Sequence, residues 1–136
     1  MHYRPEIDGL RAHSPDSRVV VIGGVPHWGK RGLPNRILRQ ARDDHTVLRT
    51  GLRLPAELDK VQARDVLLRT VAGDVAFISL LDGLCEQDKC VALVTEDGQA
   101  APIAWDYGHL TKGGSLYTSA MVQDAVAPEL SRLSRP

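Results

Sequence analysis

The stretch Arg18-Val19-Val20-Val21-Ile22-Gly23-Gly24 decides the fold class of this chain. Four β-branched residues in a row that end in glycine are typical of a buried strand in a parallel sheet. Residues 25–32 contain a proline, a tryptophan and two glycines, which indicates a loop that leaves the carboxyl end of the strand. In open α/β sheets, binding and catalytic sites usually lie at that end of the strands.

Outward from this strand, the apolar pattern predicts two helices and a second strand. Pro34 suits a first helical turn, so we expect a helix over residues 34–44. Apolar residues between positions 55 and 72 fall on one side of a second helix, which Gly73 ends. Residues 74–80 indicate another buried strand. Strand, helix and strand in this order predict an α/β fold with a mostly parallel sheet and helices on its faces.

The remaining part of the chain predicts a hairpin and a last helix. Residues 91–95 and 102–105 have strand character and are joined across Glu96-Asp97-Gly98. Asp-Gly is a turn signal, although this spacing predicts a connection longer than two residues. Gly113-Gly114-Ser115 is expected to open the last helix.

Length and charge limit the class of protein. The chain has 136 residues, with 17 basic and 17 acidic side chains, so we expect one compact domain without a bias toward nucleic acid or an anionic membrane. No stretch approaches the roughly 18 to 20 apolar residues of a membrane helix, and the start lacks the apolar segment of a signal peptide. We therefore expect no membrane segment, no nucleic-acid partner and, for the chain as written, a cytoplasmic location.

The first residues differ from the rest of the chain. Residues 1–17 are rich in charge, contain two prolines and show no sustained period of a helix or a strand. We expect a flexible leader over 1–17 that packs weakly, followed by a folded domain over 18–136.

Cys85 and Cys90 are the first chemical candidates. Their close spacing permits a small-loop disulfide, which requires an oxidising compartment, and equally permits two reduced thiols in a loop. A zinc site is disfavoured because two sulfurs need two more ligands and no other Cys or His lies near them in sequence. We expect no metal and no organic cofactor.

The segment Trp105-Asp106-Tyr107-Gly108-His109 holds the sharpest catalytic candidate. An Asp three residues before a His on a turn can hold its carboxylate against Nδ1 of the ring, so that Nε2 acts as a base toward a nucleophile. The alternative, which spacing alone favours, is that Asp106 caps a helix end and His109 is a solvated loop residue.

Several motifs in this order resemble the later part of the SGNH hydrolase domain that is fused, in bacteria, to membrane-bound acyltransferase-3 proteins, which modify cell-surface sugars. The motifs are Val20-Val21-Ile22-Gly23-Gly24-Val25-Pro26, Phe77-Ile78-Ser79-Leu80, Cys85 with Cys90, Asp106-Tyr107-Gly108-His109-Leu110-Thr111 and Gly113-Gly114-Ser115. The resemblance implies an SGNH-hydrolase-like (flavodoxin-like) three-layer sandwich. It also implies a Cys85–Cys90 disulfide and gives Asp106 the orienting role and His109 the role of general base.

The leader carries a second resemblance. Tyr3-Arg4-Pro5-Glu6-Ile7-Asp8-Gly9-Leu10-Arg11-Ala12 is similar to the opening of acyltransferase-3 membrane domains, yet no membrane helix follows it. The chain resembles an internally shortened member of the family, without the membrane domain and without the first strand of the SGNH domain. The absence of that first strand leaves a sheet edge near residues 19–22 unpaired, so we expect self-association there. The family's domain is periplasmic.

The departure from the family pattern affects the expected activity. SGNH enzymes carry their serine nucleophile in an early Gly-Asp-Ser block, which does not occur here. Ser17 precedes a strand instead of following one, and Ser115 is expected to begin a helix. The resemblance thus implies a fragment of a serine-dependent O-acyltransferase or esterase that acts on a carbohydrate or acyl ester. The alternative is a non-catalytic remnant or binding module on the same scaffold.

From these expectations two distances follow. If the cysteines are close enough to bridge, their Cα atoms lie about 4.4 to 6.8 Å apart. If the family geometry is kept, a carboxylate oxygen of Asp106 lies about 2.6 to 3.2 Å from Nδ1 of His109.

Overall fold

The computed structural model describes residues 3–133. Its helices and strands, in chain order, are α1 (Tyr3–His13), β1 (Val20–Ile22), α2 (Gly32–Asp44), β2 (Arg53–Pro55), α3 (Asp59–Ala72), β3 (Ala76–Ile78), α4 (Leu80–Leu84), β4 (Cys85–Glu86), β5 (Lys89–Val91), β6 (Leu93–Glu96), β7 (Gln99–Pro102) and α5 (Lys112–Leu133). Among these residues, no helix has the length and apolar content needed to cross a membrane.

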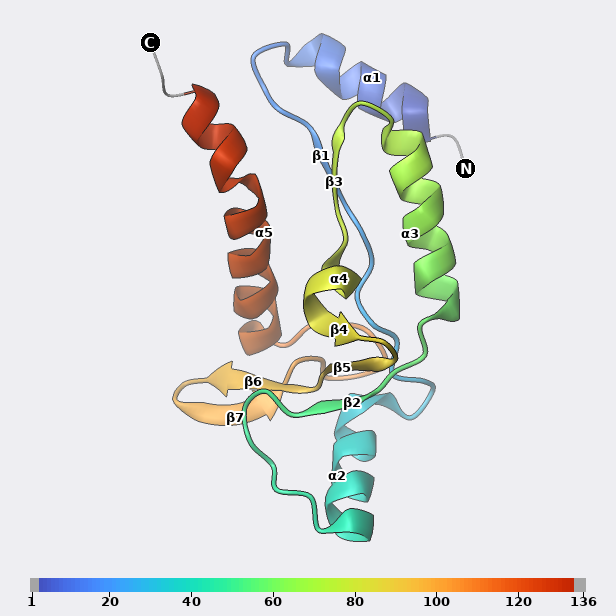
Figure 1. The fold of residues 1–136 in the computed structure, drawn as a ribbon, viewed down its shortest axis with the longest axis vertical. Helices are drawn as coiled ribbons and strands as arrows, with labels where there is room; N and C mark the ends of the chain where they lie inside the picture. The colour runs from blue at the N-terminus through green and yellow to red at the C-terminus, as the bar shows by residue number, and fades with distance from the viewer. Residues whose placement is uncertain (1–2, 134–136) are drawn as a thin grey trace.

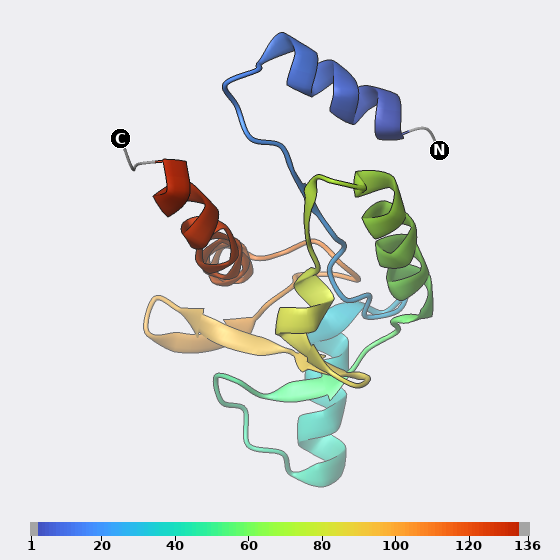
Figure 2. The ribbon, with the colours of Figure 1, turned by 45° about the horizontal axis from the view of Figure 1, so that its top comes forward.

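The predicted parallel pair is present. β1 and β3 run parallel, with Val20 opposite Ala76 and Ile22 opposite Ile78. The connection between them runs through α2, β2 and α3, and α3 ends at the predicted stop, Gly73. Figure 1 shows the two strands between α3 on one side and α5 on the other, and Figure 2 shows the same arrangement from another direction. The α/β fold class with helices on both faces is confirmed.

The expectation that these two strands are buried was wrong. Ile22 is 46% exposed, and the other side chains of β1 are only half-buried. Within residues 3–133 the parallel sheet has only these two strands, and a cavity separates them from α5. A cavity of about 1120 Å³ lies there, lined by Val20 and Phe77 from the sheet and by Ala125 and Val126 from α5. Burial of a parallel strand needs a strand on each edge and close helix packing on each face, whereas each strand here has one strand partner within the described part of the chain and the cavity separates the pair from α5.

The other strands are antiparallel and lie toward the opposite end of the molecule, where α2 extends beyond them (Figure 1). The second predicted helix begins at Asp59 instead of residue 55, because Arg53–Pro55 form β2 on the edge of the β2-β5-β4 sheet. Leu54 is 3% exposed, so its apolar signal belongs to a strand. Pro55 is compatible with that place because an edge strand can do without a backbone donor.

A hairpin is present where we predicted one, but its second strand is Gln99–Pro102 instead of residues 102–105, so its connection is shorter than expected. β6 and β7 pair with Glu96 opposite Gln99, which leaves only Asp97 and Gly98 in the turn. Both turn residues have positive φ, 49° and 80°, as a two-residue type I′ turn requires. The start of β7 was missed because its first two residues are exposed and carry no apolar signal.

The core lies at this antiparallel end and reaches into the loops around it. Its fully buried large side chains are Trp28, Leu33, Leu84, Cys90, Val94 and Ile103. Trp28 comes from the predicted loop after β1 and Leu33 from the first turn of α2. The two connections that matter for function, residues 25–32 and 103–111, are therefore anchored in packed core.

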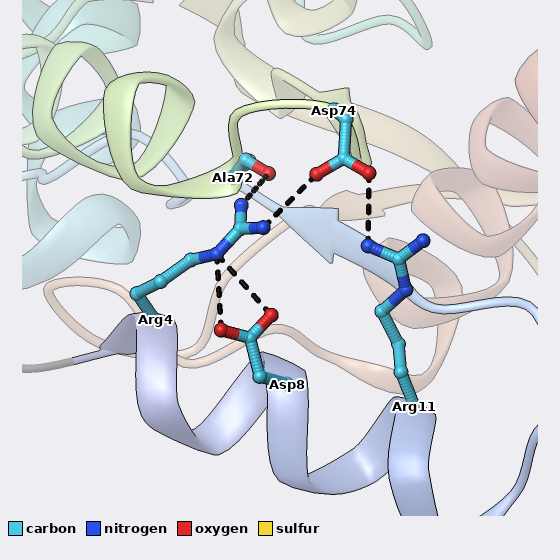
Figure 3. Close-up of polar contacts among 5 residues, drawn as sticks. All are labelled: Arg4, Asp8, Arg11, Ala72 and Asp74. Atoms are coloured by element: carbon cyan, nitrogen blue, oxygen red, sulfur yellow. Dashed lines mark hydrogen bonds and ion pairs between the residues drawn. The ribbon is translucent and has the colours of Figure 1, made fainter.

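The first residues do not form the irregular leader that we expected. α1 spans Tyr3–His13 and buries Ile7, and its contacts lie against α3. Arg4 donates to the carbonyl of Ala72 at 3.1 Å and pairs with Asp74, which also accepts from Arg11 at 2.9 Å (Figure 3). These partners lie more than sixty residues away in sequence, so a local period could not reveal them. The division of the chain at residue 17 stays a prediction.

Candidate functional site: the Asp106–His109 loop

The candidate site is a closed loop between β7 and α5, which we call the 105–109 loop. The amide of Trp105 donates to the carbonyl of His109 at 3.0 Å. Just outside this loop, Ala104 and Leu110 form an isolated antiparallel β-bridge. The amide of Thr111 donates to the carbonyl of Ile103 at 3.0 Å, after which α5 begins. The chain thus turns back on itself within five residues.

Asp106 organises the inside of this turn. Its Oδ1 accepts from the amides of Gly108 and His109 at 2.9 and 2.8 Å, and its Oδ2 lies 2.7 Å from Nδ1 of His109. The expected distance between carboxylate and imidazole is confirmed. The helix-cap alternative does not apply, because Asp106 caps its own turn. The His109 side chain is nevertheless 59% exposed, as the solvated alternative supposed.

The electrostatics of the turn keep Asp106 charged. Partial burial raises the pKa of Asp106, but the hydrogen bonds from the Gly108 and His109 amides and from the His109 ring outweigh it and lower the pKa to about 2. At neutral pH the carboxylate is an acceptor only, so it selects the ring form with a proton on Nδ1. Nε2 then carries the lone pair, which is the state that a general base needs.

A second loop, residues 25–32, holds the site in place. The amide of Trp28 donates to the carbonyl of Tyr107 at 2.8 Å, and the amide of Leu33 donates to the carbonyl of Asp106 at 3.1 Å. Gly32 has φ +74°, and a Cβ there would lie 3.1 Å from the Asp106 backbone. A glycine is therefore needed where α2 begins against the 105–109 loop. The 25–32 loop follows the carboxyl end of β1, so its contact with the 105–109 loop is consistent with a site at that end.

Sequence reasoning missed three side chains around His109. The Trp105 ring stacks on the His109 ring at 5.3 Å between centroids, and the Tyr107 ring meets it edge-on at 5.3 Å. His27 lies 5.2 Å from Tyr107 and 3.6 Å from Glu57, measured from Nδ1 to a carboxylate oxygen. For Trp105 and Tyr107, the sequence signal that could have indicated this cluster was the presence of a ring at every second position from 105 to 109.

Another carboxylate joins the ends of the parallel strands. Asp65 in α3 is 7% exposed and accepts from the amide of Gly24 at 3.0 Å and from the Ser79 hydroxyl at 2.7 Å. It holds the residues that follow β1 and β3 together. No hydrogen bond connects it with the 105–109 loop.

The cysteines form a disulfide, as the resemblance implied. Cys85 and Cys90 are direct partners across β4 and β5, and their Cα atoms lie 4.0 Å apart. The cysteines are close enough to bridge, as expected, but their separation is shorter than the expected range of about 4.4 to 6.8 Å. Cys90 is fully buried in the core. Its place there gives the disulfide a structural role, distinct from that of the hydrogen-bonded pair Asp106 and His109, which we call the dyad.

Neither candidate serine is joined to the dyad. Ser17 is exposed and precedes β1, whereas the loop that contacts Tyr107 follows β1. Ser115 is exposed in the first turn of α5, where its amide donates to the carbonyl of Thr111 at 2.8 Å. Among residues 3–133, no serine hydroxyl hydrogen-bonds to His109, and no group of three or more His, Cys, Asp or Glu side chains is placed to hold a metal ion.

Comparison with solved structures finds the same fold. The chain is similar to the periplasmic domain of the lipopolysaccharide acetyltransferase of Salmonella ser. Paratyphi A, with a TM-score of 0.69 and 22% sequence identity. The match covers 93% of this chain and 47% of that chain, so this chain spans about half the length of its structural neighbour. No curated protein gives a significant match.

Comparison with protein families gives the assignment. The pattern of the SGNH domain fused to AT3 domains matches residues 4–124, which is most of the chain and includes the dyad and both cysteines. This chain therefore belongs to the family of SGNH domains that are fused to AT3 domains.

Proposed function

We propose that this chain is the base-bearing part of an SGNH-type O-acyltransferase or esterase, related to the acylation of bacterial cell-surface carbohydrate. The observation that carries the proposal is the 2.7 Å contact between Asp106 and Nδ1 of His109 in a chain of this family. The structural neighbour is a lipopolysaccharide acetyltransferase domain, which supports the same class of substrate.

The proposed chemistry follows from the ring geometry. As a hydroxyl oxygen attacks the carbonyl carbon of an ester, Nε2 of His109 takes the hydroxyl proton. The ring is then an imidazolium, and the ionised Asp106 stabilises it through Nδ1. When the tetrahedral intermediate collapses, the same proton goes to the leaving alkoxide. A second round with a sugar hydroxyl or with water completes transfer or hydrolysis.

The nucleophile is the open part of this proposal. Ser17 and Ser115 are not joined to His109, and more than half of the structural neighbour has no counterpart in this chain. We propose that the serine comes from outside residues 3–133. The alternative is a non-catalytic remnant or binding module, which the 59% exposure of His109 supports.

An acetyl-transfer assay tests the proposal. The isolated chain is mixed with phenyl acetate, with and without N-acetylserinamide as a soluble substitute for the serine, and His109→Ala is compared with the wild type. We expect negligible hydrolysis without the substitute and His109-dependent acetyl transfer to it. His13→Ala, which alters an exposed histidine that bonds only to the carbonyl of Gly9, is the matched control.

Two results would change the assignment. If the serine substitute gains no acetyl group in a His109-dependent way, the non-catalytic alternative stands. If the chain hydrolyses the ester strongly alone and loses this activity in His109→Ala, the nucleophile lies within the chain, and Ser17 and Ser115 become the candidates.

The compartment also remains a proposal. A disulfide persists in an oxidising compartment. The Cys85–Cys90 bridge therefore supports a periplasmic location over the cytoplasmic one that we expected for the chain as written.

A further inference from the structure

Two large aromatic side chains beside the dyad are exposed. Trp105 is 61% exposed and Tyr107 is 46% exposed, although both contact the ring of His109. The ring of His27 is tilted against that of Tyr107, and these side chains make up an aromatic face of Trp105, Tyr107, His109 and His27. Contiguous exposed rings around a polar centre are a feature of binding surfaces.

The aromatic face is held rigidly. The 105–109 loop is closed by its own backbone hydrogen bond at 3.0 Å and is tied to the Trp28 and Leu33 amides, whose side chains are buried. Asp106 fixes the turn from inside with three hydrogen bonds. A ligand that binds to these rings does not have to order the loop backbone that carries them, so less affinity is lost to entropy.

A cavity with a charged and polar lining lies on the far side of Glu57 from the aromatic face, and none of the four rings lines it. It has a volume of about 510 Å³, within the range of small-molecule sites, and lies along α2 and the 25–32 loop. Its lining includes Asn35, Gln40, Arg39 and Glu57. Glu57 connects the two regions, because its carboxylate lies 3.6 Å from Nδ1 of His27. The occupant that suits both regions has a flat apolar face and many hydroxyl groups.

We propose that Trp105 and Tyr107 stack against a pyranose ring and thereby present one of its oxygen substituents to Nε2 of His109. The C–H face of a pyranose packs on aromatic rings, while its hydroxyl groups point outward to polar partners. The polar cavity along α2 takes the next sugar of an oligosaccharide. A purely apolar partner would leave the charged lining of that cavity without hydrogen bonds. The inference rests on the proposed function only for the role of His109.

The two tryptophans of the chain provide a direct test by NMR. Trp105 is exposed and Trp28 is 2% exposed, so the indole N–H signals of the two report the aromatic face and the core separately. The probes are the methyl pyranosides of glucose, galactose, mannose and rhamnose, added to the whole chain up to high millimolar concentration. D-Glucitol, which has similar hydroxyl groups and no ring, is the control ligand. Trp105→Phe assigns the signals.

We expect at least one pyranoside to move the Trp105 signal in a saturable way, with the Trp28 signal unchanged and no effect of glucitol. Tyr107→Ala should weaken this binding at least about fivefold, the loss of one ring contact of about 1 kcal/mol. Leu116→Ala, at a 63% exposed position on α5, should leave it unchanged. An unmoved Trp28 signal in each variant shows that the core is kept.

Failure of this inference can be told from failure of the proposed function. The sugar proposal is overturned if no pyranoside moves the Trp105 signal, if glucitol moves it equally, or if Tyr107→Ala binds as the wild type does. None of these measurements requires turnover. Binding without any His109-dependent acetyl transfer would keep the sugar site and point to a binding module.

Discussion

Asp106 is the residue on which the local structure of the site depends. One carboxylate satisfies two backbone amides and one imidazole within four residues of chain, and it is 22% exposed. Charged acceptors make stronger hydrogen bonds than neutral ones, so the turn and the ring orientation depend on the same negative charge. Loss of that charge should therefore affect the fold of the loop and the base together.

The pKa of Asp106 predicts a pH dependence. Its folded pKa of about 2 lies below the ordinary value of 3.8, so Asp106 contributes stability above pH 3.8 that is lost as the pH falls through about 2. Chemical denaturation of the wild type and of Asp106→Asn between pH 5 and 2 measures this contribution. We expect the wild type to be more stable at pH 5 and the difference to shrink toward pH 2.

Asp97→Asn is the control for this series, because Asp97 is 78% exposed and pairs only with Lys112. A difference between wild type and Asp106→Asn that stays constant over this pH range would show that the charge of Asp106 does not stabilise the turn.

The sequence predicted this geometry because all hydrogen-bond partners of the Asp106 carboxylate lie within three residues of it. An Asp before a Gly-His turn can reach the two following amides without help from the rest of the fold. His27 was not recognised as a neighbour, since its contact with Tyr107 joins loops eighty residues apart in the sequence. Local spacing predicts the dyad, whereas the aromatic face depends on packing between distant loops.

Among the elements, α1 shows how long-range charge contacts place a helix. Arg11 and Arg4 both hydrogen-bond to Asp74, and they hold the pKa of that carboxyl below its ordinary value (Figure 3). Arg4 also reaches the carbonyl of Ala72, one of the last carbonyls of α3, which have no partner within the helix. These contacts join α1 to the end of α3.

Substitution of Asp74 should loosen α1 selectively. In Asp74→Asn, Arg4 and Arg11 lose their charged partner, so we expect faster amide exchange over residues 3–13. We expect little change in the core, because exposed ion pairs contribute little to global stability. Hydrogen exchange followed by mass spectrometry measures this. Asp82→Asn, which alters the exposed pair with Arg69, is the matched control. Equal exchange over residues 3–13 in both variants would contradict the docking role of Asp74.

Reduction of the disulfide should lower the stability of the whole domain. A bridge that closes a loop as short as 85–90 is expected to contribute about 2 kcal/mol through the unfolded state. Urea denaturation with and without a reductant, and of the double variant C85S/C90S, measures this free energy. We expect a loss of that size in both. An unchanged free energy of unfolding in the reduced wild type and in C85S/C90S would contradict a stabilising role of the disulfide.

The elements that the sequence predicted correctly carry local signals: the apolar run of β1, the stop at Gly73 and the Asp97-Gly98 turn. β2 was missed because its three residues, the last of them a proline, leave too little pattern, and their strand character comes from pairing with β5. α1 was missed because it buries a single apolar side chain, Ile7. Tertiary partners decide such segments, and they are not visible in a local period.

For the whole molecule, the parallel sheet is the part with the fewest partners. Within residues 3–133, β1 pairs only with β3, and the cavity of about 1120 Å³ lies between this pair and α5. The family and the α/β class could be predicted from ordered motifs. The exposure of the sheet could not, because burial depends on how many strands flank β1.

This exposure leads to the prediction of self-association. An open strand edge with valine and isoleucine side chains is a template for pairing with a second copy. Light scattering over a series of concentrations should show a mass that rises above the monomer, and Val21→Lys in the middle of β1 should lower it. A wild-type chain that remains monomeric throughout the series would contradict this expectation.

The ring state of His109 tests the central claim most directly. In a chain with nitrogen-labelled histidine, NMR at a pH where the ring is neutral identifies which nitrogen carries the proton. We predict the proton on Nδ1 and the lone pair on Nε2, because the ionised Asp106 accepts from Nδ1 at 2.7 Å. We also predict loss of this preference in Asp106→Asn. A proton mainly on Nε2 in the wild type, or the same ring state in both proteins, would contradict the claim that Asp106 orients His109 as a base.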